Sequence, residues 1–396
     1  MGEISAQRLI EACSDMSIDT GLRFSIDLEP VGGPGAPVKP AIYEGGRYQT
    51  DRRWASPSDE AATDVVVIDN VPSQANRLEA TLKAFRDVAG LPEFRLDLSG
   101  AGSMPAHLPR SISSLQFPHR NADAYLRDAQ LDGVDFGKTA LGKSILDATP
   151  WSAGALMAWF PQSLLFGFWQ SHLGSKKAQT KHARAWNSEI LGWKPATTGV
   201  RVMGLKGDPL NLNTKDEVTS NTSDRSDWVF GKGSVEGGSK DKLSEMGHGQ
   251  IPFMSDDEKL APAGISFARL SQLATVSFAQ LRRVGLGASG EADATARALL
   301  VALGVFAHVH AFGRAFALRS GADLIPVSQR LEWLGSDGTE VVMPSREAAS
   351  ALLAGCVDAA RSAGVPLDGW GREPQRLTPK DNLLKAIRAT WPQEDD

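Results

Sequence analysis

The sequence predicts an α+β fold in which long insertions interrupt a sandwich of strands and helices. A short apolar run at 65–68 leads directly into a helix pattern at 73–88, and a strand-rich stretch at 265–284 leads into an Ala-rich helix at 292–312. The 396 residues, 42% of them hydrophobic, are enough for one large or two ordinary domains with a substantial core.

The first elements are a strand, a loop and a strand–helix pair. Apolar and polar residues alternate from Leu22 to Leu28, as in a strand with one buried face, and Gly and Pro then predict a loop at 31–40. The run Val65 to Ile68 predicts a short buried strand. We expect Ser73 to cap the following helix, since apolar residues recur at helical spacing beyond it.

The middle of the chain predicts loops and short helices. Residues 99–120 are loop-like, and 121–130 favour a helix. The stretch 148–175 contains no Lys, Arg, Asp or Glu and includes Trp151 and Trp169. A polar break at 161–163 divides it, so it predicts two short buried helices meeting at the proline rather than a membrane span.

Later segments predict a polar insertion and a helical end. Residues 211–249 are rich in Ser, Thr, Asp, Gly and Lys, which indicates either a mobile loop or a projecting hairpin. Residues 330–343 predict a hairpin that turns at 336–338. A helix is expected at 345–363, capped by Ser345.

Charge and cysteine content restrict the function classes. The net charge of −5 counts against a general nucleic-acid binder. However, residues 176–206 hold seven Lys or Arg against the single acid Glu189, which indicates either a local basic groove or a solvated loop. Two distant cysteines and an N-terminus without an apolar run favour a reducing cytoplasm and no signal peptide.

Two glycine motifs match the residue patterns of nucleotide-binding loops but lack the sequence context that such loops need. Residues 137–144 fit G-x-x-x-x-G-K-S but follow a poor strand, so ATP binding is not favoured. Residues 285–290 fit G-x-G-x-x-G, but the acid expected about 20 residues later is missing. No metal-binding or nucleophile signature appears among the histidines and cysteines, so we expect no cofactor and no metal.

Several tracts in colinear order resemble one family. They are GGRYQ (45–49), DNVPSQANRLE (69–79), PHRNADAYLRD (118–128), LLFG (164–167), SEI (188–190), SEMGHGQIP (244–252) and LRR (281–283). Together they resemble the backbone, Cas seven-type subunit of type I-G (formerly I-U) CRISPR effector complexes, also called Cascade. The resemblance runs from about residue 20 to 345, with Met246 and Gln250 departing from the expected Ile and Asn.

The resemblance implies an RNA-recognition-like (RRM or ferredoxin-like) palm with large finger and thumb insertions. On this basis we expect the palm at 1–98 and 261–345, a helical finger-like insertion at 99–200 and a thumb-like polar insertion at 201–260. A C-terminal helical extension would follow at 346–396.

The resemblance also implies a non-catalytic, cytoplasmic subunit that polymerises along CRISPR RNA and presents its spacer for pairing with target DNA. Its expected partners are copies of itself, the large subunit, Cas five- and Cas six-type subunits and a recruited helicase-nuclease. No membrane partner is expected.

Candidate RNA contacts are polar, basic and amide side chains in these tracts and in the basic stretch. A helix N-terminus carrying amides and an Arg suits a phosphate, and RNA that must pair with DNA has to be held through its backbone. The candidates are Arg47, Tyr48, Gln49, Ser73, Gln74, Asn76, Arg77, His119, Arg120, Arg127, Lys176, Lys177, Lys181, Arg184, Arg282 and Arg283. Trp228, Val229 and Phe230 are the candidate base-displacing residues of the thumb.

Several ordinary structural roles compete with these assignments. Ser73 can serve only as a cap, Tyr48 can belong to the core, and Arg127 can pair with a neighbouring aspartate. Two other functions also stay open. One is an RNA endonuclease of the same superfamily, with Asp69, His119 and His248 as candidate catalytic groups, and the other is an ATPase that uses residues 137–144.

Overall fold

The computed structural model describes residues 2–44, 47–102, 104, 108–171, 180–196, 210, 212, 215–222, 224–248, 264–286, 289–335 and 339–389. The chain forms two compact units. Unit 1 consists of Met1–Ala196 and Gly264–Arg388, and unit 2 consists of Thr197–Ala263 and Ala389–Asp396.

A large antiparallel sheet organises unit 1. Within the described residues it has eight strands in the order β17-β18-β1-β16-β12-β5-β4, with β19 paired to β18. In that order the first seven strands are Phe316–Ala317, Asp323–Leu334, Gly21–Pro30, Phe267–Ser277, Trp186–Pro195, Thr63–Asp69 and Thr50–Arg53, and β19 is Thr339–Val341. Neighbours in this sheet are therefore often distant in sequence.

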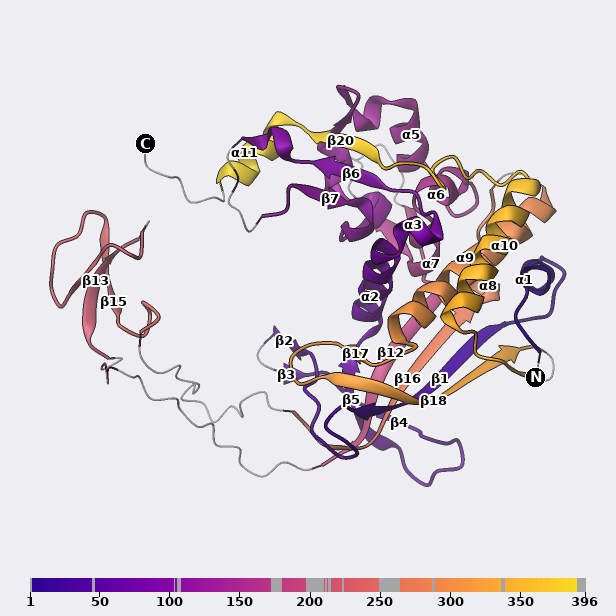
Figure 1. Cartoon of the computed structure of the whole chain (residues 1–396), viewed down its shortest axis with the longest axis horizontal. Helices are drawn as coiled ribbons and strands as arrows, with labels where there is room; N and C mark the ends of the chain where they lie inside the picture. The colour runs from indigo at the N-terminus through magenta and orange to yellow at the C-terminus, as the bar shows by residue number, and fades with distance from the viewer. Residues whose placement is uncertain are drawn as a thin grey trace. The chain divides into compact units, whose positions relative to one another are not determined.

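Helices cover one face of this sheet. Figure 1 shows α2 (Val71–Ala84), α9 (Gly290–Phe312) and α10 (Arg346–Ser362) on the same side of the strands, and α9 contacts both α2 and α10. On β1 the even-numbered residues Leu22 to Leu28 are buried, while the intervening residues are polar and partly exposed. This alternation sets the helix-covered face.

The core helix α9 is apolar all round because elements surround it. It is long and apolar enough to cross a membrane, but 89% of its most apolar window is buried within the protein. Gly304 lies where Trp186 of β12 packs against the helix, and a Cβ there would come within 2.4 Å of the indole ring. A single buried helix of this kind is weak evidence for a membrane span.

A second sheet in unit 1 contains five short strands within the described residues, in the order β7-β6-β20-β8-β9. These strands are Ser111–Ser113, Phe94–Asp97, Gln375–Pro379, Ala129–Leu131 and Val134–Asp135. Strand β20 pairs in parallel with β6, so a segment near the C-terminus completes a sheet begun almost 300 residues earlier. The expected C-terminal helical extension therefore also contains a strand.

Two further hairpins and several shorter helices form among the described residues of unit 1. The hairpins are β2–β3 (Ile42–Tyr43 with Arg47–Tyr48) and β10–β11 (Phe168–Gln170 with Thr180–His182). The remaining helices are α1 (Ala6–Cys13), α3 (Arg86–Ala89), α4 (Ala124–Arg127), α5 (Ala140–Leu146), α6 (Gly154–Trp159), α7 (Pro161–Phe166), α8 (Phe278–Leu281) and α11 (Asp381–Ala389), and the 3-10 turns are η2 (Ser99–Ala101), η3 (Ser114–Gln116), η4 (Arg120–Ala122) and η5 (Phe136–Lys138).

Unit 2 contains a small antiparallel sheet. Strand β13 (Glu217–Asn221) lies between β14 (Trp228–Phe230) and β15 (Gly238–Lys242). Val218 and Leu243 are buried, and the ring of Trp228 packs 5.6 Å from that of His248. The predicted projecting hairpin is therefore a three-stranded sheet in the described part of this insertion.

The mixed fold class and most long elements are confirmed. The strands at 22–28 and 65–68, the two helices meeting at Pro161, the Ala-rich helix and the Ser345-capped helix all form. The expected helix at 121–130 is wrong in extent, since the turn η4, the short helix α4 and the start of strand β8 form there. The turn of the predicted hairpin at 336–338 lies outside the described residues, although its strands pair as β18 and β19.

Candidate functional site

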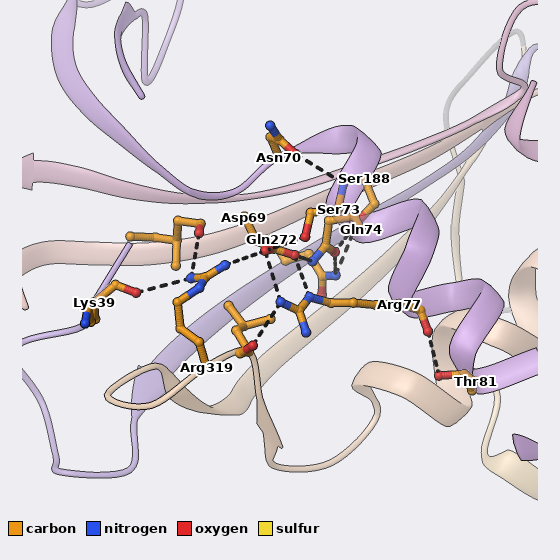
Figure 2. A network of polar contacts seen from close by, with 12 residues as sticks. Lys39, Asp69, Asn70, Ser73, Gln74, Arg77, Thr81, Ser188, Gln272 and Arg319 are labelled. Carbon is orange, nitrogen blue, oxygen red and sulfur yellow. Dashed lines mark hydrogen bonds and ion pairs between the residues drawn. The ribbon is translucent and has the colours of Figure 1, made fainter. Parts of the chain in front are cut away.

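A buried carboxylate, that of Asp69, organises the start of α2. Its side chain is fully buried at the end of β5. It accepts hydrogen bonds from Ser73 Oγ at 2.9 Å and Gln74 Nε2 at 2.6 Å. Arg77 Nε also donates to it at 2.8 Å (Figure 2). The first turn of α2 therefore points its polar side chains at the preceding strand.

A second arginine reaches the same carboxylate from a distant segment. Arg319 Nη2 donates to Asp69 Oδ1 at 2.8 Å, and Arg319 Nη1 donates to the carbonyls of Lys39 and Ile68. Arg77 Nη2 donates to the Leu318 carbonyl at 3.0 Å. Two guanidinium groups thus share one carboxylate and join the β5–α2 corner to the segment before β18.

Gln74 extends this network into the eight-stranded sheet. Its Oε1 accepts hydrogen bonds from Ser188 Oγ of β12 at 2.9 Å and from Gln272 Nε2 of β16 at 2.8 Å (Figure 2). All three side chains are buried. A polar network inside a core costs free energy unless its members are hydrogen-bonded, so these contacts fix the position of α2 over the sheet.

The expected helix cap at Ser73 is wrong. Asn70 is the N-cap, and its side-chain oxygen accepts from the Ser73 backbone amide at 3.1 Å. Ser73, Gln74 and Arg77 bind Asp69 instead of facing a ligand, so the expected phosphate cradle is occupied by protein groups. Asn76 is the exposed candidate of this turn and lines a shallow cleft beside Phe117.

The β2–β3 hairpin brings further candidates near this corner. Arg47 and Gln49 are exposed, and Gln49 Oε1 accepts from Asn70 Nδ2 at 3.5 Å. Tyr48 is partly buried against the core cluster that contains Ile68, which fits its structural role. Tyr43, which was not among the candidates, is 37% exposed on the same hairpin.

A separate cleft gathers four of the other candidates. It has a volume of about 680 Å³, and its lining includes His119, Arg120, Lys181 and Arg184. His119 and Arg120 come from the segment before α4, Lys181 from β11, and Arg184 from the β11–β12 connection. No acidic side chain of the described residues lines the cleft. The basic stretch and the family tract at 118–128 therefore meet in space.

Within this cleft, Arg120 is bound to the protein. Its Nε and Nη2 each lie 2.7 Å from an oxygen of Glu79, and its Nη1 donates to the Gly167 carbonyl at 3.0 Å. Burial raises the pKa of Glu79, and the hydrogen bonds and charge of Arg120 oppose that rise. Arg120 is 9% exposed and has a left-handed backbone with φ 56°. Its donors are mostly occupied by the chain.

Gly167 permits the close packing at the floor of the cleft. It has φ +80°, and a Cβ there would lie 2.8 Å from the His182 carbonyl and 3.1 Å from Arg184 Cγ. A side chain at this position would displace the β11–β12 connection. The glycine therefore lets Arg120 and Arg184 approach the same point of the backbone.

Strand alternation in the β10–β11 hairpin turns two side chains outward. Phe168 pairs with His182, and both are buried, whereas Trp169 pairs with Lys181 and is 61% exposed. Lys181 Nζ lies 5.8 Å from the centre of the Trp169 ring. Trp169 and Trp151 were both expected to be buried, and the structure shows them exposed.

The remaining basic candidates are dispersed. Arg282 donates to the carbonyls of Ala12, Ser14 and Asp19, so it stabilises the end of α1 rather than a surface site. Arg283 is exposed, and Arg127 is half-buried on α4. Lys176 and Lys177 lie outside the described residues.

In unit 2, the three candidate thumb residues form β14. Val229 and Phe230 are exposed, by 36% and 65%, while Trp228 is partly covered by His248. Phe230 is the most accessible large apolar side chain of this strand. A base-displacing role for these residues stays a prediction.

The described residues of the two glycine motifs contact other groups of the chain. Residues 137–144 lie in η5 and α5, with Lys138 bound to Asp135 at 2.8 Å and Thr139 capping α5. Before α9, Ser289 is the N-cap, and Asp293 accepts from the Leu286 amide. Among the described residues, no group of three His, Cys, Asp or Glu is placed to hold a metal ion.

One comparison finds a family model that matches part of the chain. Residues 22–196 match the family model described as CRISPR-associated protein GSU0053 (Cas_GSU0053). This segment contains β1, β5, α2, the cleft and β12. The match supports a CRISPR-associated protein involved in CRISPR defence. No curated protein matches the sequence significantly.

Proposed function

We propose that this protein is the non-catalytic backbone subunit of a type I-G CRISPR effector complex and polymerises along CRISPR RNA. The observation that carries the proposal is the match to the CRISPR-associated family over 22–196, the segment that builds the cleft and half of the sheet. The spacer would then stay free to pair with target DNA. The colinear family tracts from residue 20 to 345 also support the proposal.

The sheet topology supports an RNA-recognition-like palm. The strands β18, β1, β16 and β12 are neighbours in that order, and every pair is antiparallel. Along the chain they alternate with α2 and α9 as β1-α2-β12-β16-α9-β18. This is the β-α-β-β-α-β order of ferredoxin-like folds, with β5 added beyond β12.

The exposed basic side chains supply the backbone contacts. RNA held for pairing is bound through phosphate and 2′-hydroxyl groups, and cations supply most of that affinity. Apart from Arg120, which is bound to Glu79, the exposed or cleft-lining candidates are Arg47, Gln49, Asn76, His119, Lys181, Arg184 and Arg283. Because the whole chain is acidic, we propose that a narrow basic surface faces RNA while the acids face solvent or other subunits.

The other partners follow from this role. We propose a cytoplasmic assembly of several copies with the large subunit, Cas five- and Cas six-type subunits and a recruited helicase-nuclease. A nuclease role for Asp69 is disfavoured, because its buried carboxylate is already bound by two arginines. His119 in the cleft and His248 beside Trp228 are the remaining candidates for the alternative endonuclease function.

Co-expression of the full chain with a CRISPR array tests the proposal. We expect the purified protein to carry RNA of repeat–spacer sequence, with a native mass that contains several 42.3 kDa chains. A ratio of absorbance at 260 to 280 nm no higher than that of protein alone would overturn it. His119→Ala and His248→Ala should leave the length of the bound RNA unchanged. If the protein were a nuclease that uses one of these histidines, the corresponding variant would instead carry longer, uncut RNA.

A further inference from the structure

The two arginines at the floor of the cleft differ in their partners. Arg120 has a bidentate ion pair with Glu79 and a hydrogen bond to the Gly167 carbonyl. Arg184 lies close enough to both Glu79 and Arg120 to interact electrostatically, but its Nε has no hydrogen-bond partner, and no described residue forms an ion pair with it. The charge of Glu79 is therefore compensated by Arg120, and no described carboxylate compensates the charge of Arg184.

The environment of Arg184 favours an anion. Burial lowers the pKa of its guanidinium, the charge of Arg120 lowers it further, and Glu79 acts in the opposite direction. His119 and Lys181 line the same cleft, which has no acidic side chain among its described lining residues. A phosphate group would supply the hydrogen-bond acceptors and the negative charge that this guanidinium lacks.

An exposed aromatic ring, that of Trp169, lines the same cleft. Trp169 is 61% exposed, and its cross-strand partner Lys181 lies above the ring. A large exposed aromatic side chain next to unpaired cations is the combination that binds single-stranded nucleic acid, with bases stacking on the ring and phosphates on the cations.

We propose that Arg184 binds a phosphate of single-stranded RNA, that Trp169 stacks on a base of the same strand, and that Glu79 acts as a positioning residue. Glu79 keeps Arg120 bound to the protein, so Arg120 braces the cleft and does not contact the ligand. This inference rests on the proposed function, and it separates two arginines that the sequence treats as equivalent.

Salt dependence of RNA binding tests the division between the arginines. The probe is a fluorescein-labelled oligouridine titrated into the full chain after removal of nucleic acid in high salt. Arg184→Gln should reduce the slope of log affinity against log salt by about 0.7, the loss of one phosphate contact on a single strand. The slope should stay unchanged in the double variant Glu79→Gln/Arg120→Gln, which removes both charges of the buried pair and so avoids leaving one of them uncompensated.

Stacking is tested in the same titration. Trp169→Ala should weaken binding by about 5- to 150-fold with an unchanged salt slope, because the lost contact is not ionic. Trp151→Ala is the matched control, since Trp151 is 73% exposed and does not line the cleft. Lys143→Gln is the corresponding control for an exposed cation elsewhere on unit 1.

The outcomes separate this inference from the proposed function. Salt-dependent binding by the wild-type chain that is unaltered in the Arg184 and Trp169 variants would overturn the inference alone. A reduced slope in the double variant, with none in Arg184→Gln, would assign the phosphate to Arg120 and overturn it as well. No binding of the oligouridine by the wild-type chain would overturn both.

Discussion

Arg319 Nη2 lies 2.8 Å from Asp69 Oδ1, which joins two segments 250 residues apart in the sequence. Asp69 ends β5, and Arg319 precedes β18, on the other side of β1, β16 and β12 in the sheet order. Arg77 of α2 binds the same carboxylate. Asp69 is therefore the point at which a sheet strand, a covering helix and a distant loop are tied together.

Replacing Asp69 with Asn should destabilise the protein by about 3–5 kcal/mol, because two partly buried guanidinium groups would lose the carboxylate that they share. Urea unfolding at neutral pH measures the change. Asp64→Asn is the control, since the Asp64–Arg52 pair is largely exposed and should contribute no measurable stability. Equal losses in the two variants would contradict a central role for Asp69.

Replacing Lys143 with Ala should not affect nucleotide binding, because the wild-type chain should not bind ATP through residues 137–144. Gly142 is packed so tightly that a Cβ would lie 1.8 Å from the Phe136 carbonyl, and this turn leaves no open phosphate loop. Thermal unfolding with and without Mg·ATP checks this expectation. A rise in Tm on adding Mg·ATP to the wild type but not to Lys143→Ala would revive the ATPase hypothesis.

The sequence was sufficient for the elements that have a strong apolar pattern. β1 was predicted because its apolar and polar residues alternate with the period of a strand that has one buried face. β5 and α9 were predicted because each is a nearly continuous apolar run, short in the strand and long and Ala-rich in the helix, as expected for elements buried on all sides. The cap of α2 was not, since Asn70 and Ser73 are both good capping residues and only the backbone geometry distinguishes them.

The candidate site was predicted only in part because its long-range pairs have no local signal. The sequence identified His119, Arg120, Lys181 and Arg184, and the structure brings them together. It could not show that Glu79 binds Arg120, which is 41 residues away, or that Arg319 binds Asp69. Basic residues cannot be told apart in a sequence. Only the carboxylates that they contact in the structure show which arginine is held by the protein and which is available to a ligand.

Gly304→Ala should destabilise the protein by about 1–3 kcal/mol, although Ala is the better helix former. The new Cβ would lie 2.4 Å from the Trp186 ring, and overpacking outweighs the propensity gain. Gly355→Ala on α10 is the matched control, because its Cβ would make only an ordinary 3.8 Å contact with Ala6. Thermal unfolding should show opposite shifts, and a stabilised Gly304→Ala would disprove the packing argument.

His308 should make the protein less stable as pH falls. Its ring is fully buried among Phe24, Trp186 and Phe312, and neither ring nitrogen has a hydrogen-bond partner in the part of the chain that the structure describes. Burial lowers its pKa from 6.5 to about 3. Between these pH values the unfolded chain binds one proton more than the folded chain, so the free energy of unfolding falls by about 1.4 kcal/mol per pH unit on acidification.

His308→Leu should remove this contribution. Urea unfolding measures the free energy of unfolding of wild type and variant from pH 6.5 to 3. The slope of this free energy against pH should be smaller in the variant by about 1.4 kcal/mol per pH unit, which corresponds to one proton. Acidic side chains titrate in both proteins, so the difference between the two curves isolates the histidine. Parallel curves for wild type and His308→Leu would mean that His308 is solvated or hydrogen-bonded in the native protein.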